Sequence, residues 1–445
     1  MKTHRFYLLS LGCAKNTVDS QSMAEILTQS GYQPVEKPSQ AGVLIVNTCG
    51  FIEAARQESL QALQDLAKRK RKDQVLVAAG CLTDRYRQKL VEEVPGLDGI
   101  LSTRRWMDIL DMLDKLSTRR SREPLYHIPD VPTVGLDEHG VIRAAAQGSS
   151  AYLKIADGCR RPCAFCSIPL IKGTAVSRPE QTIVQEAVVL QDAGIQELIL
   201  IAQDTTDYGS DLGMKDGLAN LLEQITTTAP EIPWIRLMYA YPGFVTDRLI
   251  EVMASHKQIL PYLDIPLQHA HPETLRRMRR PANMDWVHQT IAKMRAAMPD
   301  LSLRTTFIVG YPGETETEFQ ALLDFVQTIR FDHVGVFNFS FEPGTTSEPL
   351  GDPIPPEVKE SRREAVMRLQ ESISLAKNQT FVGKTLDVLV EGCENGISVG
   401  RSYRDAPEID GLVLIEDETE PGQIIPVQIT GAMVHDLTGR LYPPQ

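Results

Sequence analysis

Residues 151–166 read A-Y-L-K-I-A-D-G-C-R-R-P-C-A-F-C, an apolar run followed at once by three cysteines. The run predicts a β-strand over Tyr152–Ala156, so the cysteines share one loop at its end. They are Cys159, Cys163 and Cys166. Three thiolates at this spacing can bind three irons of a [4Fe–4S] cubane and leave the fourth iron open for a small molecule with adjacent amine and carboxylate groups. Zinc would normally need a fourth protein ligand, and no Cys or His is near, so zinc and metal-free thiols are the weaker alternatives.

Downstream of this loop, the chain alternates strand-like and helical patterns. Further strands are expected at 197–202, 234–240, 262–267, 302–310 and 333–340. Helices are expected at 180–193, 246–255, 284–298 and 316–329. With the first strand, these segments make six β/α units over roughly 190 residues, and they predict a partial (β/α)6 barrel because a complete barrel needs about eight units.

The first ~120 residues predict a separate α/β domain by the same patterns. Its strands are expected at Phe6–Leu11, Val43–Asn47 and Val75–Ala79, and its helices at 19–30 and 52–70. A cysteine follows each strand: Cys13, Cys49 and Cys81. The carboxyl ends of parallel strands lie along one edge of a sheet, so these thiols are expected to converge there, although scattered thiols can also be inert core residues.

Residues 117–150 are rich in Arg, Pro and Gly, which is typical of an interdomain connection, here with a short β excursion. A charged amphipathic helix is expected at 357–379. Short strand-like runs separated by Gly, Pro and acidic turns follow, and they predict a small antiparallel β-barrel. These runs are 385–390, 397–400, 412–415 and 428–432.

No apolar run approaches the roughly 18 residues of a membrane-spanning helix, so no membrane contact is expected. The apolar start before Cys13 is very short, and it predicts a first strand of a cytoplasmic protein rather than a lipoprotein signal. The net charge of −12 argues against a general nucleic-acid binder. Residues 378–445 contain four basic and eleven acidic residues, a net charge of −7. Such a barrel repels phosphate and suits a basic partner protein, although an acidic solvated face without a partner is the alternative.

Several motifs together resemble one enzyme family. The loop from Asp157 through Pro169 resembles that of the radical S-adenosylmethionine (SAM) superfamily. Three cysteine motifs resemble the amino-terminal domain of methylthiotransferases, and residues 378–445 resemble their TRAM β-barrel. These motifs are Cys13-Ala-Lys-Asn16, Asn47-Thr-Cys49 and Gly80-Cys81. The resemblance implies an α/β architecture with three domains: an α/β domain with an auxiliary cluster at 1–120, a radical SAM partial barrel at 145–376, and a TRAM barrel at 378–445.

Within this radical SAM methylthiotransferase family, four segments resemble the RimO type, which modifies an aspartate of small-subunit ribosomal protein twelve. They are 201–209, 262–270, 278–281 and 400–411. The rival MiaB type modifies adenosine in tRNA, shares the clusters, and should have a neutral or basic terminal barrel. A rival from another class is a non-catalytic iron–sulfur protein that binds the ribosome.

The resemblance implies insertion of sulfur and a methyl group at the β-carbon of the aspartate. It implies two [4Fe–4S] clusters, one held by Cys159, Cys163 and Cys166 and an auxiliary one held by Cys13, Cys49 and Cys81. Two molecules of SAM per turnover and an external electron donor complete the reaction. The substrate protein, free or in the ribosomal subunit, is expected to contact the acidic TRAM barrel, while the sulfur donor and the reductase stay unidentified.

Five further residues are candidates for contacts with SAM. They are Phe165, Gln203, Asp204, Arg304 and Gly310. Phe165 adjoins the last cysteine of the loop and can meet the adenine. Gln203 and Asp204 end the second barrel strand, and strand alternation directs Arg304 toward the same face. Gly310 ends the fifth strand and lets the backbone approach the nucleoside, unless it serves only a tight turn.

Overall fold

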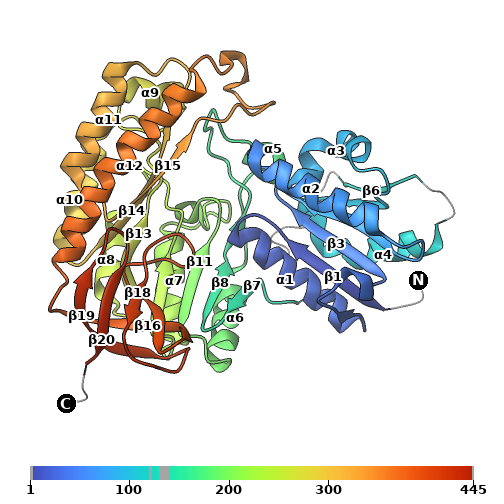
Figure 1. The fold of residues 1–445 in the computed structure, drawn as a ribbon, viewed down its shortest axis with the longest axis horizontal. Coiled ribbons are helices and arrows are strands. Elements are labelled where there is room, and N and C mark those ends of the chain that lie inside the picture. The colour runs from blue at the N-terminus through green and yellow to red at the C-terminus, as the bar shows by residue number, and fades with distance from the viewer. Residues whose placement is uncertain (1–3, 120–122, 130–139, 443–445) are drawn as a thin grey trace.

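The computed structural model describes residues 4–119, 123–129 and 140–442, which form three parts in chain order (Figure 1). An amino-terminal α/β part and a carboxy-terminal β-barrel both lie against a central open barrel. Of the expected connection at 117–150, residues 120–122 and 130–139 lie outside the described residues. None of the helices described is both long enough and apolar enough to span a membrane.

The amino-terminal part is a parallel six-stranded sheet in the order β2-β1-β3-β4-β5-β6, with helices on both faces. The strands are β1 Arg5–Ser10, β2 Gln33–Pro34, β3 Val43–Thr48, β4 Val75–Gly80, β5 Gly99–Leu101 and β6 Leu125–His127. The helices are α1 Ala14–Gln29, α2 Glu53–Arg69, α3 Cys81–Glu93 and α4 Ile109–Thr118. Helices α1 and α4 cover one face and α2 and α3 the other. Every residue of β3 is therefore buried, as its unbroken apolar run Val43–Val46 requires.

The central part is an open seven-stranded sheet in the order β15-β14-β13-β12-β11-β8-β7. Six strands are parallel, and β7 pairs antiparallel with β8 at one edge, so the expected partial barrel is confirmed. The strands are β7 Ala144–Gln147, β8 Ser150–Lys154, β11 Glu197–Ile201, β12 Trp234–Leu237, β13 Ile259–Asp264, β14 Ser302–Val309 and β15 His333–Asn338. Strand β7 is the β excursion expected in the connection.

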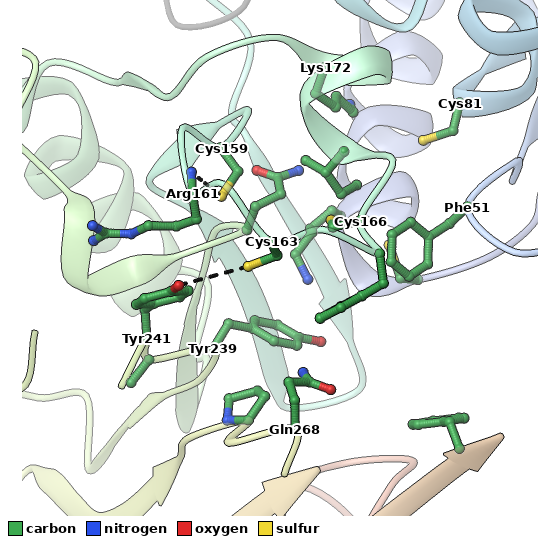
Figure 2. A pocket seen from close by; sticks show the side chains of 18 of the residues that line it. Phe51, Cys81, Cys159, Arg161, Cys163, Cys166, Lys172, Tyr239, Tyr241 and Gln268 are labelled. Carbon is green, nitrogen blue, oxygen red and sulfur yellow. Dashed lines mark hydrogen bonds between the residues drawn. The ribbon is translucent and has the colours of Figure 1, made fainter. Parts of the chain in front are cut away.

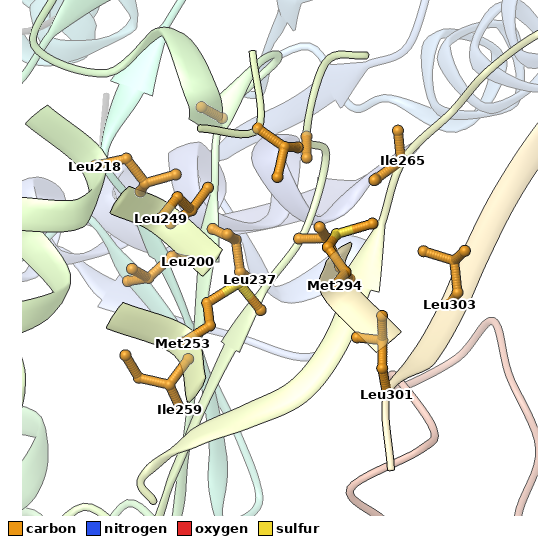
Figure 3. Close-up of a cluster of buried hydrophobic side chains, with 14 of the residues drawn as sticks. Leu200, Leu218, Leu237, Leu249, Met253, Ile259, Ile265, Met294, Leu301 and Leu303 are labelled. Carbon is orange, nitrogen blue, oxygen red and sulfur yellow. The ribbon is translucent and has the colours of Figure 1, made fainter. Parts of the chain in front are cut away.

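Helices cover the outer face of this sheet. They are α6 Glu180–Asp192, α7 Gly217–Thr228, α8 Asp247–Ser255, α10 Met284–Ala297, α11 Glu316–Ile329 and α12 Pro356–Gln379. Figure 3 shows the resulting core, in which Leu200 and Leu237 from the strands pack with Leu249 and Met294 from the helices. Helix α7, which the sequence patterns missed, contributes Leu218 to the same core.

The carboxy-terminal part is a closed five-stranded barrel in the order β16-β17-β18-β20-β19. Its strands are β16 Thr385–Glu394, β17 Ile397–Ser402, β18 Val413–Ile415, β19 Ile424–Ala432 and β20 Leu437–Leu441. The expected small barrel is confirmed, with one strand more than the sequence patterns indicated. Strand β20 closes the barrel because it pairs with both β18 and β19.

A buried ion cluster joins the amino-terminal part to the central barrel. The carboxylate of Asp19 in α1 forms ion pairs with Lys154 at 2.5 Å and with Lys172 at 3.0 Å. Arg143 pairs with both Asp19, at 3.1 Å, and Asp157, at 3.0 Å. Burial alone would raise the pKa of Asp19, but Lys154 and Lys172 together hold it below its usual value. The carboxylate therefore stays ionised and ties the two parts together.

A second buried ion cluster joins the terminal barrel to the central one. Glu197 of β11 lies between Arg236 of β12 at 2.6 Å and Arg401 of β17 at 2.5 Å. Burial opposes its charge, yet the two guanidinium groups lower the pKa of Glu197 to about 2. Beside it, Leu389 and Ala406 of the terminal part pack into an apolar cluster with strand residues of the central barrel.

Candidate active site

A cavity of about 460 Å³ lies where the amino-terminal part meets the open barrel (Figure 2). All six cysteines predicted as cluster ligands line it, so the structure brings the two sets of thiols to one chamber. The other lining residues include charged, amide and aromatic side chains. They are Lys15, Asn16, Phe51, Arg161, Phe165, Ile168, Lys172, Gln203, Tyr239, Ala240, Tyr241, Pro266, Gln268, Arg280 and Phe337.

The loop with Cys159, Cys163 and Cys166 runs from β9 (Ala156–Asp157) to α5 (Ile168–Lys172). Backbone hydrogen bonds fix it to the barrel, because the Ala164 N–H donates to the carbonyl of Met278 at 2.9 Å and the Ser347 N–H donates to the carbonyl of Ala164 at 2.8 Å. Local contacts then orient the thiols. The Arg161 N–H lies 3.5 Å from Cys159 Sγ, and the Tyr241 hydroxyl lies 3.8 Å from Cys163 Sγ.

The other three thiols are brought together by the ends of neighbouring strands β1, β3 and β4. Asn16 donates from Nδ2 to the Thr48 carbonyl at 2.9 Å, and Asn47 donates back to the Asn16 carbonyl at 2.9 Å. The Asn16 Oδ1 atom lies 3.8 Å from Cys81 Sγ. One asparagine therefore connects the segments that hold Cys13, Cys49 and Cys81.

Two glycines make this convergence sterically possible. Gly12 has a φ of +97°, and a Cβ atom there would lie 2.8 Å from Cys49 Cβ. Gly80 has a φ of +92°, and a Cβ atom there would lie 2.3 Å from the Thr48 carbonyl oxygen. Both backbone conformations favour glycine, and both distances are shorter than real Cβ contacts, so larger residues would push the cysteine segments apart.

The thiols differ in their acidity. Burial raises the pKa of Cys159 to about 11 and those of Cys81 and Cys166 to about 12, and it also raises the pKa of Cys49. Burial opposes ionisation of Cys13 as well, but Lys15 and the backbone N–H groups at the start of α1 lower its pKa. Most of these thiols therefore stay protonated until a metal displaces the proton.

The donor set fits iron–sulfur clusters. All six thiols are free, and no three Cys, His, Asp or Glu side chains in the described ranges are close enough to share one metal ion. The thiolates that hold a cubane do not need to share one ion, because each of them binds a different iron. Within the described residues, the buried amide oxygens of Gln203 and Gln268 have no hydrogen-bond partner, although both side chains line the cavity. The chamber thus offers sulfur ligands and unused acceptors for a polar cofactor.

Of the predicted SAM contacts, Phe165 and Gln203 line the cavity, whereas Asp204 lies just behind its wall. Asp204 accepts a hydrogen bond from Arg161 Nε at 2.6 Å. Burial raises the pKa of Asp204, and the Arg161 guanidinium opposes the rise. Asp204 therefore holds Arg161 at the cavity wall.

The two other predicted contacts lie outside the cavity lining. Arg304 pairs with Asp264 at 3.1 Å and with Asp410 of the terminal barrel at 3.2 Å. Gly310 packs against the stem of Lys359, where a Cβ atom would lie 2.3 Å from Lys359 Cγ. In the described structure, Arg304 thus serves the contact between the two barrels and Gly310 a turn next to α12.

Sequence reasoning missed polar cavity residues, and five of them lie in the first turn of α1 or in loops. They are Lys15, Tyr239, Tyr241, Gln268 and Arg280. Lys15 stands inside the motif of Cys13, which was the available signal. Tyr239 and Gln268 have φ values of 62° and 76°, a strained conformation that no local pattern reveals.

Comparison with known families agrees with this architecture. Residues 5–102 match Uncharacterized protein family UPF0004, residues 153–326 match the Radical SAM superfamily, and residues 382–441 match the TRAM domain. Among curated relatives, Ribosomal protein uS12 methylthiotransferase RimO of Roseiflexus sp. is 48% identical over 98% of this chain and 97% of its own. The protein of the same name from Chloroflexus aurantiacus is 48% identical over 98% and 99%.

Solved structures resemble the chain in fold alone. The radical S-adenosylmethionine methyltransferase TsrM from Kitasatospora setae aligns with a TM-score of 0.57 at 12% identity, over 89% of this chain and 77% of that one. The cobalamin-dependent radical enzyme OxsB aligns with a TM-score of 0.53 at 13% identity, over 83% and 56%. At these coverages, both likenesses include residues of the amino-terminal part as well as the open barrel.

Proposed function

Because the chain belongs to the RimO family of methylthiotransferases and is a radical SAM enzyme, we propose that it modifies ribosomal protein uS12. The modification is insertion of sulfur and a methyl group at the β-carbon of an aspartate. Full-length similarity to uS12 methylthiotransferases carries the proposal, and the six cysteines around one cavity support it. The domains are proposed at 1–120, 145–376 and 378–445 in a cytoplasmic protein, with β6 extending the first sheet to residue 127.

Cys159, Cys163 and Cys166 would hold one [4Fe–4S] cluster, and Cys13, Cys49 and Cys81 would hold the second. When bound, the clusters and two molecules of SAM supply three things: a sulfur atom, a methyl group and the one-electron chemistry that opens an unactivated C–H bond. Acid–base groups of the chain alone cannot open such a bond, which is why a cofactor is needed.

The residues of the chain position these groups. Gln203 and Gln268 supply free amide oxygens to the cavity, and Phe165 supplies an aromatic face beside Cys166. Arg280 donates from Nη1 toward Cys163 Sγ at 3.5 Å and stacks on Tyr241 at 4.2 Å. Its positive charge therefore stabilises negative charge at this thiolate.

The substrate approaches through the side of the cavity where two apolar side chains are exposed. Phe51, just after Cys49, is 37% exposed, and Phe337 on the edge strand β15 is 56% exposed. Both also line the cavity. Exposed aromatic residues at a cavity mouth are typical of a surface that another protein covers.

A loop of the terminal barrel, residues 402–410, packs against strands of the central barrel. The Tyr262 hydroxyl donates to Asp410 at 2.7 Å, and Arg236 donates to the Tyr403 carbonyl at 2.8 Å, which anchors the loop under the central strands. Ile409 is 45% exposed, and Glu408 is exposed with a φ of +69°. Burial raises the pKa of Tyr239 in the cavity wall, and the charge of Glu408 contributes to that rise. Glu408 is therefore the acidic group of the terminal barrel best placed to meet a basic substrate.

The external electron donor needs access to the cluster loop from outside. A second cavity of about 320 Å³ adjoins Cys159, Cys163 and Cys166 and is lined by Arg160, Arg161 and Arg279. We assign electron entry to this side, because the second cavity reaches the three cysteines of the loop. The main cavity is then left free for SAM and substrate.

The experiment that tests the function is the intact mass of uS12 from cells lacking this protein and from complemented cells. A methylthio increment should disappear on deletion and return with the wild-type gene, but not with Cys163→Ala. If the mass of uS12 does not change, the substrate assignment is wrong, and tRNA nucleosides from the same cells become the next candidates.

A further inference from the structure

Four cations line the main cavity within the described residues, and three of them have polar partners. Lys172 pairs with Asp19 at 3.0 Å, and Arg161 donates to Asp204 at 2.6 Å. Arg280 donates to the Pro266 carbonyl and toward Cys163. Only Lys15 makes neither a hydrogen bond nor an ion pair with any described side chain, so its ammonium group is available to an incoming anion.

The position of Lys15 is nevertheless well defined. It lies in the first turn of α1, two residues after Cys13, and its Nζ atom sits 3.2 Å from the ring centroid of Tyr239. This cation–π contact fixes the side chain and provides no counter-ion. Because the amino terminus of α1 also carries partial positive charge, the surroundings of Lys15 favour a negatively charged ligand.

Two carboxylates can enter this cavity in the proposed reaction: that of the methionine end of SAM and that of the substrate aspartate. Lys15 belongs to the Cys13 segment, whereas Arg280 contacts Cys163 of the other set of thiols. We assign the sulfur to the auxiliary cluster of Cys13, Cys49 and Cys81, as the resemblance implies, so the substrate that receives it must approach this set. The anion next to Lys15 is therefore expected to come from the substrate.

We propose that Lys15 binds the side-chain carboxylate of the aspartate that is modified, an inference that rests on the proposed function. The carboxyl carbon is bonded directly to the β-carbon. Holding the carboxylate therefore places the reacting carbon within one bond of a fixed point. The same contact makes the enzyme select aspartate over asparagine, because a neutral amide leaves the ammonium group without its partner.

The test measures binding of uS12, and of uS12 with its target aspartate changed to asparagine, to the anaerobic holoenzyme without reductant. Wild-type enzyme should bind the aspartate form about tenfold more tightly, as a charge-assisted hydrogen bond in a cavity allows. Lys15→Gln should bind both forms equally, and Lys15→Arg should restore part of the preference. Lys37→Gln, the same charge change at an exposed lysine of the same domain, should keep the full preference.

Iron and sulfide content and the KM for SAM complete the design. The inference requires that Lys15→Gln retain about eight irons per chain and raise the KM for uS12 rather than that for SAM. It is overturned if the variant loses half of its iron, which would make Lys15 a support of the cluster, or if only the KM for SAM rises. It is also overturned if wild-type enzyme binds both forms of uS12 equally. Failure to bind either form would instead refute uS12 as the substrate.

Discussion

The two sets of three cysteines reach the same cavity by opposite routes. Cys159, Cys163 and Cys166 lie within eight consecutive residues, and one loop orients them with its own backbone. Cys13, Cys49 and Cys81 span 69 residues and meet only because three parallel strands end at one edge. The first set thus depends on local spacing and the second on the tertiary fold. A local distortion at the ends of these strands should consequently abolish one site and spare the other.

The largest effect is expected from Cys163→Ala. This change removes one of three thiolates from the local loop, which has no spare ligand, so reductive cleavage of SAM should fall to background. The measurement is the release of 5′-deoxyadenosine by anaerobically reconstituted enzyme. Cys393→Ser is the matched control, because Cys393 is exposed at the end of β16 and should leave cleavage unchanged. Normal cleavage by Cys163→Ala would show that this loop does not hold the cluster that cleaves SAM.

Cys49→Ala should separate the functions of the two sets of thiols. Cleavage of SAM should continue, while sulfur insertion into uS12 stops, because the thiols of the amino-terminal sheet no longer complete their site. Mass spectrometry of uS12 and 5′-deoxyadenosine release, measured in one reaction, give both readouts. Normal methylthiolation by this variant would show that Cys13, Cys49 and Cys81 do not serve sulfur transfer.

Gly80→Ala should weaken the amino-terminal site and spare the other one, although it replaces none of the six cysteines. The new Cβ atom would overlap the Thr48 carbonyl at 2.3 Å and displace the start of α3, where Cys81 lies. Iron should fall from about eight toward about four per chain, with cleavage of SAM retained. Gly194→Ala is the control, since Gly194 has a φ of +83° but a Cβ atom there would meet no other atom within 4 Å. Equal iron loss in both variants would show that the loss comes from backbone strain and not from the overlap with the Thr48 carbonyl.

The smallest effect is expected from Glu408→Gln, which leaves both sets of thiols intact. The KM for uS12 should rise up to about fivefold, more at low than at high salt, as for an exposed ion pair. Glu394→Gln is the control: this exposed acid lies five residues beyond Leu389, roughly 15 Å along the strand from the contact with the central barrel. If the two variants behave alike, the acidic barrel acts through its overall charge only.

The sequence predicted the architecture well because the hydrophobic patterns of its strands and of most of its helices were clear. The apolar runs before Cys49 and Cys81 and the alternation in β14 correspond to observed strands. Helix α7 was missed although it packs into the core, because it lies in a segment for which no periodic pattern was identified. Strand β20 was missed because Gly439 interrupts a run of only five residues.

The site was predictable where it is local. Phe165 and Gln203 adjoin a motif or a strand end, and both line the cavity. Arg304 shows the limit of this reasoning: alternation gives the face of a strand but not the height along the barrel, and Asp410, more than a hundred residues later, holds its side chain. Tyr239 and Gln268 were not predictable, because only the packing of separate strand ends directs them inward.

The ion cluster around Asp19 has a consequence for how such enzymes can be recombined. Residues 143–172 contribute Arg143, Lys154 and Lys172 but only Asp157 to it, and the amino-terminal part supplies the second carboxylate. A central barrel cut away from its neighbour would lose the Asp19 carboxylate that pairs with all three of these buried cations, and removing one partner of a buried ion pair is strongly destabilising. The sequence shows three modules, but calorimetry should show the first two melting together, and neither can be transplanted into another protein without its partner.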